Sequence, residues 1–314
     1  MIRFAALVCT YQGERFLEEQ LQSLTVQSTP LTEVHMHDWG STDGTRAITS
    51  AWAKNQRSRC PVFENLHQKP LRPARSLLLG LQELLTRSDA THIFFCDQDD
   101  VWFADRVQRY KELLSVSKTP PSLVFSDVSL IDEKGCRLAD SFYEKSLSPY
   151  KTQVVANSPD LPLVSPALGM SMCISRELAE ILVTHRNAPW PMHDWAALML
   201  AIMFDLPTAY LTDATAAYRQ HSDNLRGSPG ISKLGPRLQR LTDRRRQVLA
   251  LRRWAIEGSK PLPTKAKNFF PASRSACATR VLRSKNLRLW YRLTFALILM
   301  FSLNSKPKDR RSID

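Results

Sequence analysis

The sequence feature that most constrains the fold is a short apolar run, residues 93–96, that ends directly in a cluster of carboxylates. Asp97, Asp99 and Asp100 follow this run within four residues. Consecutive apolar residues of this kind suit a strand that is buried on both faces, as in a parallel sheet. The carboxylates then lie at the carboxyl end of the strand, which is the edge where open α/β sheets bind ligands.

Two interpretations of these carboxylates fit the local sequence. Aspartates at positions i and i+2 repel each other unless a cation lies between them, and Mg²⁺ or Mn²⁺ is the natural partner when substrate phosphates supply further ligands. Alternatively, the turn is solvated and one aspartate caps the helix that follows, because aspartate is a favourable N-cap residue. For Asp100 this cap would belong to a helix that starts near Trp102.

Strand-like and helix-like stretches alternate over the first hundred residues. The strands are expected at 2–10, 33–38 and 93–96, and the helices at 14–25, 46–53 and 76–85. This alternation predicts βαβ units and an α/β fold with a mostly parallel central sheet flanked by helices.

The pattern changes after residue 120. A hairpin is expected at 123–142, a long loop at 148–166, a helix at 195–204 and a strand at 209–218. The predicted body of the protein therefore ends near residue 227.

The charge is divided unevenly between the two ends of the chain. The sequence has 43 Lys and Arg against 30 Asp and Glu, and residues 231–314 hold 21 of the former and 4 of the latter. We therefore predict a domain at 1–227 and a basic helical C-terminal extension at 228–314. Such asymmetry indicates an anionic partner, either a membrane surface or nucleic acid.

The end of the extension favours a membrane surface. A last helix is expected at 281–303, and its nearly all-apolar part, 293–303, is far shorter than the roughly 20 residues that span a bilayer. Flanking basic and aromatic residues suit an interfacial helix. The alternative is a helix that docks on the body. Because the basic residues alternate with leucines and no nucleic-acid module is visible, we expect no nucleic-acid partner.

Two other polar breaks are expected at the same sheet edge as Asp97. They are residues 10–14, after the first strand, and residues 37–45, after the second. The glycines of the second break match neither GxGxxG nor a Walker A motif, which excludes those two phosphate-binding loops. Asp194 precedes a later helix and is a candidate general base or an N-cap.

Seven stretches in this order resemble the family 2 glycosyltransferases of the GT-A fold. Within that family they most resemble the bacterial rhamnosyltransferase-like branch, which builds O-antigen, capsule and related surface glycans. The resemblance covers residues 2–227. The stretches are TYQGERFLEEQLQSL, DWGSTDGT, IFFCDQDDVWFADRV, FSDVSLIDEKG, GMSMCISRELAE, MHDWAALM and YRQHSDNLRG.

The resemblance implies an inverting transfer of a sugar from a nucleoside-diphosphate donor to a glycan or lipid-linked acceptor. Asp97 and Asp99 match the motif that binds a divalent cation, Mn²⁺ or Mg²⁺, and Asp194 matches the base. His221 is a candidate further metal ligand, and Arg219 a candidate phosphate contact. The positions that match the donor pocket are Thr10, Tyr11, Glu14, Asp38 and Asp97. His193 is a candidate to orient Asp194, and Trp195 to support the pocket wall.

The sequence departs from the family pattern in two places. Trp39 replaces a second acid that commonly hydrogen-bonds the pyrimidine ring of the nucleotide, so the identity of the donor nucleotide is not predicted. Trp39 is instead a candidate to stack on the nucleotide base. Residues 68–75 lack the usual glycine and include Arg72 and Arg75, which either contact the diphosphate or are solvated. An alternative function is therefore a degenerate protein that binds a nucleotide sugar or a partner without turnover. The presence of Asp97, Asp99 and Asp194 together argues against this alternative.

The compartment is also predicted. The six cysteines lack CxxC spacing, and no secretory signal is visible at the start, which favours a reducing compartment. Acceptors of the resembled family are often lipid-linked glycans at the cytoplasmic leaflet. We therefore expect a cytoplasmic protein, held peripherally on the inner face of the plasma membrane by its extension.

Overall fold

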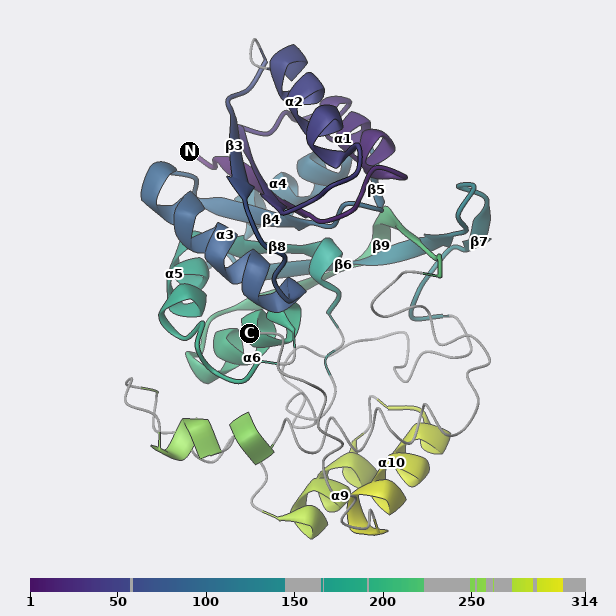
Figure 1. Cartoon of the computed structure of the whole chain (residues 1–314). Helices are drawn as coiled ribbons and strands as arrows, with labels where there is room; N and C mark the ends of the chain where they lie inside the picture. The colour runs from purple at the N-terminus through teal and green to yellow at the C-terminus, as the bar shows by residue number, and fades with distance from the viewer. Residues whose placement is uncertain are drawn as a thin grey trace.

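The computed structural model describes residues 1–56, 59–144, 165, 167–190, 192–222, 249–251, 253–257, 262, 273–284 and 287–301. These residues form a nine-stranded sheet with helices on both faces and a pair of helices near the C-terminus (Figure 1). The α/β architecture predicted from the alternating pattern is confirmed.

The first four long strands are parallel. Their order in the sheet is β3-β2-β1-β4, so that β1 is paired on both sides. The strands are β1 (Phe4–Thr10), β2 (Glu33–Trp39), β3 (Val62–His67) and β4 (His92–Cys96), joined by α1 (Leu17–Thr25), α2 (Thr45–Gln56) and α3 (Pro73–Arg87). Parallel strands have their carboxyl ends at one edge, so the polar segments that follow β1, β2 and β4 all open there.

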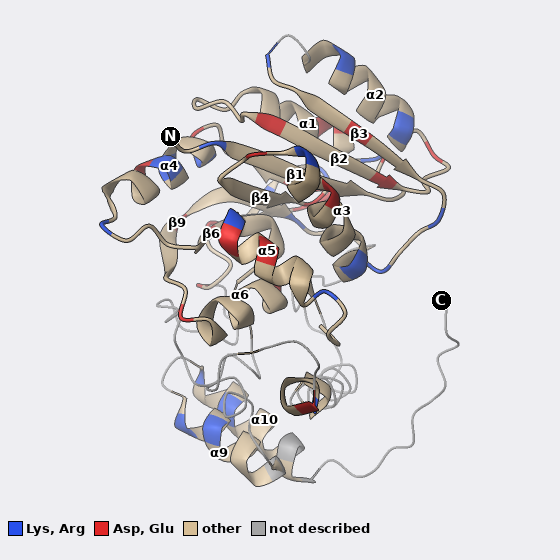
Figure 2. Ribbon diagram, turned by 90° about the vertical axis from the view of Figure 1, so that its left-hand side faces the viewer, with Lys and Arg blue, Asp and Glu red and all other residues tan. Residues whose placement is uncertain are grey.

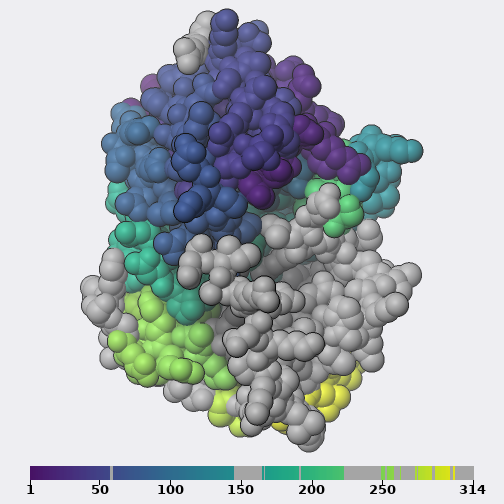
Figure 3. All heavy atoms as spheres, viewed as in Figure 1, coloured from purple at the N-terminus to yellow at the C-terminus, as the bar shows by residue number. Residues whose placement is uncertain are grey.

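The second half of the sheet is mixed. β8 pairs antiparallel with both β4 and β6, whereas β6 and β9 are parallel and β5 and β7 add antiparallel partners. The elements are β5 (Val101–Trp102), α4 (Arg106–Val116), β6 (Leu123–Ile131), β7 (Arg137–Ala139), η1 (Gly169–Ser171), β8 (Met172–Ser175), α5 (Arg176–Thr184), α6 (His193–Met203) and β9 (Thr208–Arg219). The turn between β6 and β7 projects from one side of the molecule (Figures 1 and 3).

Two hydrophobic clusters cover the two faces of the sheet. One joins β1 and β4 to α3, α5 and α6, and the other joins them to α1 and α4. This double cover explains why the strand at 93–96 is apolar throughout, since its side chains are buried on both faces.

The predicted last helix at 281–303 is wrong in one respect, because the described residues form two helices. α9 (Arg274–Arg283) ends before Ser284, and α10 (Leu289–Phe301) begins after it. The Ser284 hydroxyl accepts a hydrogen bond from the Leu287 N–H (3.3 Å), and the break lets the two helices pack against each other. Val281 of α9 and Phe295 of α10 are both fully buried. None of the described helices is long and apolar enough to cross a membrane.

Other predictions fall partly outside the described residues. The long loop predicted at 148–166 is described only at 165. The first part of the predicted basic helical extension is described only at 249–251 and 253–257, which are helical, and at 262. Strands β5 and β8 were not predicted, and neither was β3. Its side chains are mostly half-buried, so it lacks both the strict alternation and the continuous apolar run that mark a strand.

Candidate active site

The polar loops after β1 and β2 interlock at the carboxyl edge of the sheet. The Gly13 N–H donates to Thr45 Oγ1 (2.8 Å), and the Gln12 N–H donates to Ser41 Oγ (3.0 Å). Glu14 Oε2 accepts the Gly44 N–H at 2.5 Å, at the start of α2. The two loops therefore form one unit, as their common sheet edge predicts.

Asp38 is buried at the centre of this unit. Its Oδ1 accepts hydrogen bonds from Arg46 Nε (2.6 Å) and the Ser41 N–H (3.1 Å), and its Oδ2 accepts one from Thr10 Oγ1 (3.2 Å). Thr10, Glu14 and Asp38, predicted to bind the donor, are thus brought together, and their polar atoms hold the loops in place.

Tyr11 connects this unit to the acidic turn after β4. The Tyr11 side chain is exposed, whereas its N–H donates to Gln98 Oε1 (2.9 Å) and its carbonyl accepts from Gln98 Nε2 (3.1 Å). Gln98 was not among the predicted site residues. Its position between Asp97 and Asp99 could have predicted it, because every residue of this turn lies at the carboxyl edge of the sheet.

The acidic turn concentrates carboxylates that the protein satisfies poorly. Burial, followed by the charges of Asp99 and Asp194, raises the pKa of Asp97 to about 7. The pKa of Asp100 is also raised, by burial and then by Asp99 and Asp97, and the nearby Arg219 offsets this only in part. Asp100 Oδ2 has no hydrogen-bond partner among the described residues. Negative charge gathered in this way is relieved by a proton or a cation.

Asp100 does not cap a helix at Trp102, so that alternative is wrong. Trp102 belongs to β5, and α4 begins only at Arg106, with Asp105 at its N-cap position. Asp100 Oδ1 instead accepts the Arg219 N–H (3.0 Å), which fastens the turn to the end of β9.

Asp194 reaches the acidic turn from the first turn of α6. It contributes to the raised pKa of Asp97, which places the two carboxylates near each other. The N-cap residue of α6 is Met192, so Asp194 is not the N-cap. Its side chain is 7% exposed, and Oδ1 accepts the Trp195 N–H at 2.6 Å. A carboxylate in the first turn of a helix is also favoured by the helix dipole.

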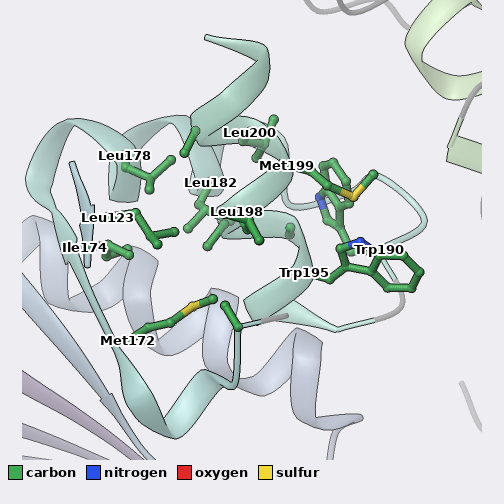
Figure 4. Close-up of a cluster of buried hydrophobic side chains, with 14 of the residues drawn as sticks. Leu123, Met172, Ile174, Leu178, Leu182, Trp190, Trp195, Leu198, Met199 and Leu200 are labelled. Atoms are coloured by element: carbon green, nitrogen blue, oxygen red, sulfur yellow. The ribbon is translucent and has the colours of Figure 1, made fainter. Parts of the chain in front are cut away.

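The neighbours of Asp194 anchor α6 in the core. Trp195 is fully buried with Leu198 and Met199, so it belongs to the core, and its support of a pocket wall stays a prediction (Figure 4). The His193 ring lies edge-on to Phe95, with centroids 5.3 Å apart. A Cβ on Gly169 would come within 2.5 Å of His193 Nε2, so the close approach requires glycine there.

Asp99 and His221 are brought together as the metal prediction requires. His221 Nε2 lies 2.8 Å from Asp99 Oδ2. The charge of Asp99 helps to raise the pKa of Asp97, so these two carboxylates affect each other. However, the ligand atoms of Asp97, Asp99 and His221 do not all lie within 4.8 Å of one another. An ion there would have to draw Asp97 inward.

Arg219 is used for positioning. Its guanidinium is buried and donates from Nε to the Asp99 carbonyl (2.9 Å) and from a terminal nitrogen to Glu19 Oε2 (2.5 Å). It also stacks over the Phe16 ring. These contacts hold the acidic turn against α1 and favour a structural role over the predicted phosphate contact.

Trp39 does not lie where it could stack on a base. The side chain is 5% exposed, and its ring is stacked on His67 with centroids 3.7 Å apart and planes at 4°. The tryptophan that replaces the expected acid thus fills the space between β2 and β3. Arg72 and Arg75 are exposed near the start of α3.

Comparisons with known proteins bear on this arrangement. The family model "Glycosyl transferase family 2" matches residues 5–162, about half of the chain. A putative teichuronic acid biosynthesis glycosyltransferase, TuaG of Bacillus subtilis, is 26% identical over 41% of this chain and 48% of its own length. The aligned part thus spans about half of that relative. The dTDP-rhamnosyl transferase RfbG of Shigella flexneri is 21% identical over 70% of this chain and 74% of its own length.

Solved structures share the fold. TarS 1-349 of S. aureus, in complex with UDP-GlcNAc, is 15% identical, with a TM-score of 0.53 over 95% of this chain and 72% of that one. The mannosyltransferase PcManGT of Pyrobaculum calidifontis, in complex with GDP-Man and Mn²⁺, is 18% identical. Its TM-score is 0.58 over 95% of this chain and 74% of that one. At these identities the likeness shows a common fold.

Proposed function

Because the chain belongs to glycosyltransferase family 2 and has the GT-A fold, we propose that it transfers a sugar from a nucleoside-diphosphate donor to an acceptor hydroxyl, with inversion. The observation that carries this proposal is that the start of α6 packs on the end of β4, where the His193 ring lies edge-on to Phe95. This packing brings Asp194 to the same region as the acidic turn, and its charge helps to raise the pKa of Asp97. A base beside a site for the leaving diphosphate is the arrangement that sugar transfer needs.

Asp194 is the proposed base. The Trp195 N–H holds one carboxylate oxygen, which fixes the orientation of the group as the acceptor approaches. Asp194 takes the proton of the acceptor hydroxyl while that oxygen attacks the anomeric carbon from the face opposite the diphosphate. The new glycosidic bond forms as the bond to the diphosphate breaks, so the configuration inverts. The proton ends on Asp194, and the diphosphate leaves as an anion.

Asp97, Asp99 and His221 are the proposed ligands of a divalent cation. Two carboxylates and an imidazole suit Mn²⁺ or Mg²⁺ when phosphate oxygens complete the shell. The raised pKa of Asp97 and the partnerless Oδ2 of Asp100 fit a region that positive charge would stabilise. The bound cation would offset the charge that develops on the diphosphate. The Mn²⁺ in the PcManGT complex supports this assignment.

The donor we propose to test first is dTDP-rhamnose, because RfbG is named as a dTDP-rhamnosyl transferase. TuaG, named for teichuronic acid synthesis, supports a glycan or lipid-linked acceptor. The decisive experiment is a calorimetric screen of UDP-, dTDP- and GDP-sugars with Mn²⁺, beside the Asp99→Asn variant. We expect one nucleotide class to bind only with Mn²⁺ and to lose affinity in the variant. Absence of Mn²⁺-dependent binding would overturn the cation assignment, and binding without product formation would indicate the degenerate protein.

We further propose that residues 228–314 form an extension that holds the protein on the cytoplasmic face of an anionic membrane. Exposed apolar residues of α10 recur at helical spacing at Leu289, Leu293, Leu297 and Met300, and Trp290 is exposed as well. Basic residues of α9 lie in the part of the molecule remote from α1 and α2 (Figure 2). Each basic residue near an anionic surface contributes about 1 kcal/mol. Deletion of residues 273–314 should abolish sedimentation with phosphatidylserine vesicles. Undiminished sedimentation would refute the assignment.

A further inference from the structure

A second cluster of metal-binding side chains lies away from the acidic turn, between the sheet and α3. It consists of His37 on β2, His67 at the end of β3 and Glu83 on α3. One ligand atom from each lies within 4.8 Å of the others. Among the described residues, no other three His, Cys, Asp or Glu side chains gather so closely.

The distances match those of a tetrahedral site. His37 Nδ1 lies 3.2 Å from His67 Nε2 and 3.8 Å from Glu83 Oε2. Zinc binds imidazole nitrogen at about 2.0–2.1 Å and carboxylate oxygen at about 2.0–2.2 Å, which places neighbouring ligand atoms about 3.4 Å apart in a tetrahedron. Small side-chain adjustments would therefore close the cluster around an ion.

We propose that His37, His67 and Glu83 bind a zinc-class transition-metal ion, with the fourth position open to water or an external ligand. Two imidazoles and one carboxylate favour Zn²⁺ over Mg²⁺, which prefers oxygen ligands. The ion would join β2, β3 and α3 directly behind the loop that follows β2. The proposal is independent of sugar transfer.

The surroundings hold both imidazoles in place. Trp39 stacks on His67 with centroids 3.7 Å apart and so fixes the plane of that ring. Gly80 lets α3 approach His37, since a Cβ there would lie 3.3 Å from the ring. The side chain of Glu83 is 39% exposed, which gives the ion a route from solvent. In this proposal, Trp39, which stands where the family pattern has an acid, orients the His67 ring for coordination.

Nδ1 of His37 faces His67 and Glu83, and its Nε2 faces Asn65 on the other side. Asn65 Nδ2 lies 3.3 Å from His37 Nε2, and Arg87 donates to Asn65 Oδ1 (2.9 Å). Coordination through Nδ1 leaves hydrogen on Nε2, so the Asn65 amide must turn its oxygen toward His37. Arg87 is exposed and free to follow that rotation. Without an ion, a single hydrogen shared by His37 and His67 gives the same 3.2 Å contact.

The test separates these two states and also removes the acidic turn from the measurement. The full chain carrying Asp97→Asn and Asp99→Asn is stripped with EDTA and titrated with Zn²⁺ against a chromophoric chelator, and separately with Co²⁺. Glu83→Gln is added to this background, with Glu112→Gln on α4 as the matched control. His67→Gln serves as a second ligand variant.

We expect about one zinc ion per chain, a visible Co²⁺ spectrum of tetrahedral type and a Zn²⁺-dependent rise in Tm. Glu83→Gln and His67→Gln should weaken Zn²⁺ binding at least about tenfold, and Glu112→Gln should leave it unchanged. If the EDTA-stripped Asp97→Asn, Asp99→Asn protein does not bind added Zn²⁺, the proposal is overturned. Equal zinc affinity with and without Glu83→Gln would overturn it as well.

Discussion

The loop after β2 and the turn after β4 are built alike and behave differently. Each follows a buried parallel strand and opens at the same edge of the sheet. At the end of β2, where this loop begins, both oxygens of Asp38 accept hydrogen bonds from neighbouring groups. In the turn, the pKa of Asp97 is raised to about 7, and Asp100 Oδ2 has no partner among the described residues.

This difference separates a supporting element from a reactive one. Polar groups that satisfy one another make a loop rigid and stable. Carboxylates forced together cost stability and are retained where a ligand or a reaction uses them. The loop after β2 is therefore expected to hold shape, and the turn after β4 to perform chemistry.

The largest effect is expected from Asp194→Asn. The amide cannot accept the acceptor proton, so transfer should fall about 10²- to 10⁴-fold while affinity for the nucleotide stays the same. Single-turnover transfer and calorimetric binding measure the two quantities. Asp213→Asn, at an exposed carboxylate on β9 that pairs with Arg109, is the control and should retain activity. A variant of Asp194 with normal transfer would remove Asp194 from the mechanism.

Asp97→Asn should lower activity and raise stability. The pKa of Asp97 in the folded protein, about 7, lies above its ordinary value of 3.8. Between these values the folded state binds more protons, so wild-type stability falls as the pH rises from about 4 to 7. The variant escapes this loss, and its Tm should exceed that of wild type by a few degrees at pH 8, since 1 kcal/mol corresponds to about 2–4 °C.

The pH profile distinguishes this cause from a general packing effect. With EDTA present, the Tm advantage of Asp97→Asn should shrink as the pH falls and vanish near pH 4. Mn²⁺ should raise the Tm of wild type at pH 8 and have little effect on the variant. A constant advantage at every pH would mean that the charge of Asp97 is not the source.

The sequence anticipated the reactive turn better than the supporting contacts. The acidic turn at Asp97 and Asp99 was predicted from a local pattern, the end of a buried strand. Asp194 read locally as either an N-cap or a base, and the resemblance alone assigned it as the base. His221 was named as a candidate metal ligand only through the resemblance, from its place in the stretch YRQHSDNLRG.

Features set by contacts between distant residues were missed. Trp39 was expected to stack on the nucleotide base, and it is instead buried against His67. The strand that carries His67, β3, was not predicted. Arg219 was expected at phosphate, and its donors go to Asp99 and Glu19. The break at Ser284 depends on α9 packing against α10. Neither composition nor periodicity encodes these pairings.

Asp38→Asn should act in the direction opposite to Asp97→Asn. It removes the charge that accepts the short hydrogen bond from Arg46 Nε, and bonds to charged groups contribute about 1.5–3 kcal/mol. Its free energy of unfolding, measured in urea, should fall by that amount. Asp140→Asn, at an exposed carboxylate paired with Arg137, should be neutral. If Asp38→Asn and Asp97→Asn both raised stability, the loop after β2 could not be called a supporting element in contrast to the turn after β4.

The smallest effect is expected from Glu14→Gln. Glu14 Oε2 accepts the Gly44 N–H at the N-terminus of α2, where a negative charge contributes about 0.3–1 kcal/mol. Glutamine keeps the oxygen and loses the charge, so the urea midpoint should fall slightly while nucleotide affinity holds. Glu112→Gln on α4 is the matched control. Loss of nucleotide binding at unchanged stability would show that Glu14 contacts the donor itself, and the loop after β1, which interlocks with the loop after β2, would then join the turn after β4 as a reactive element.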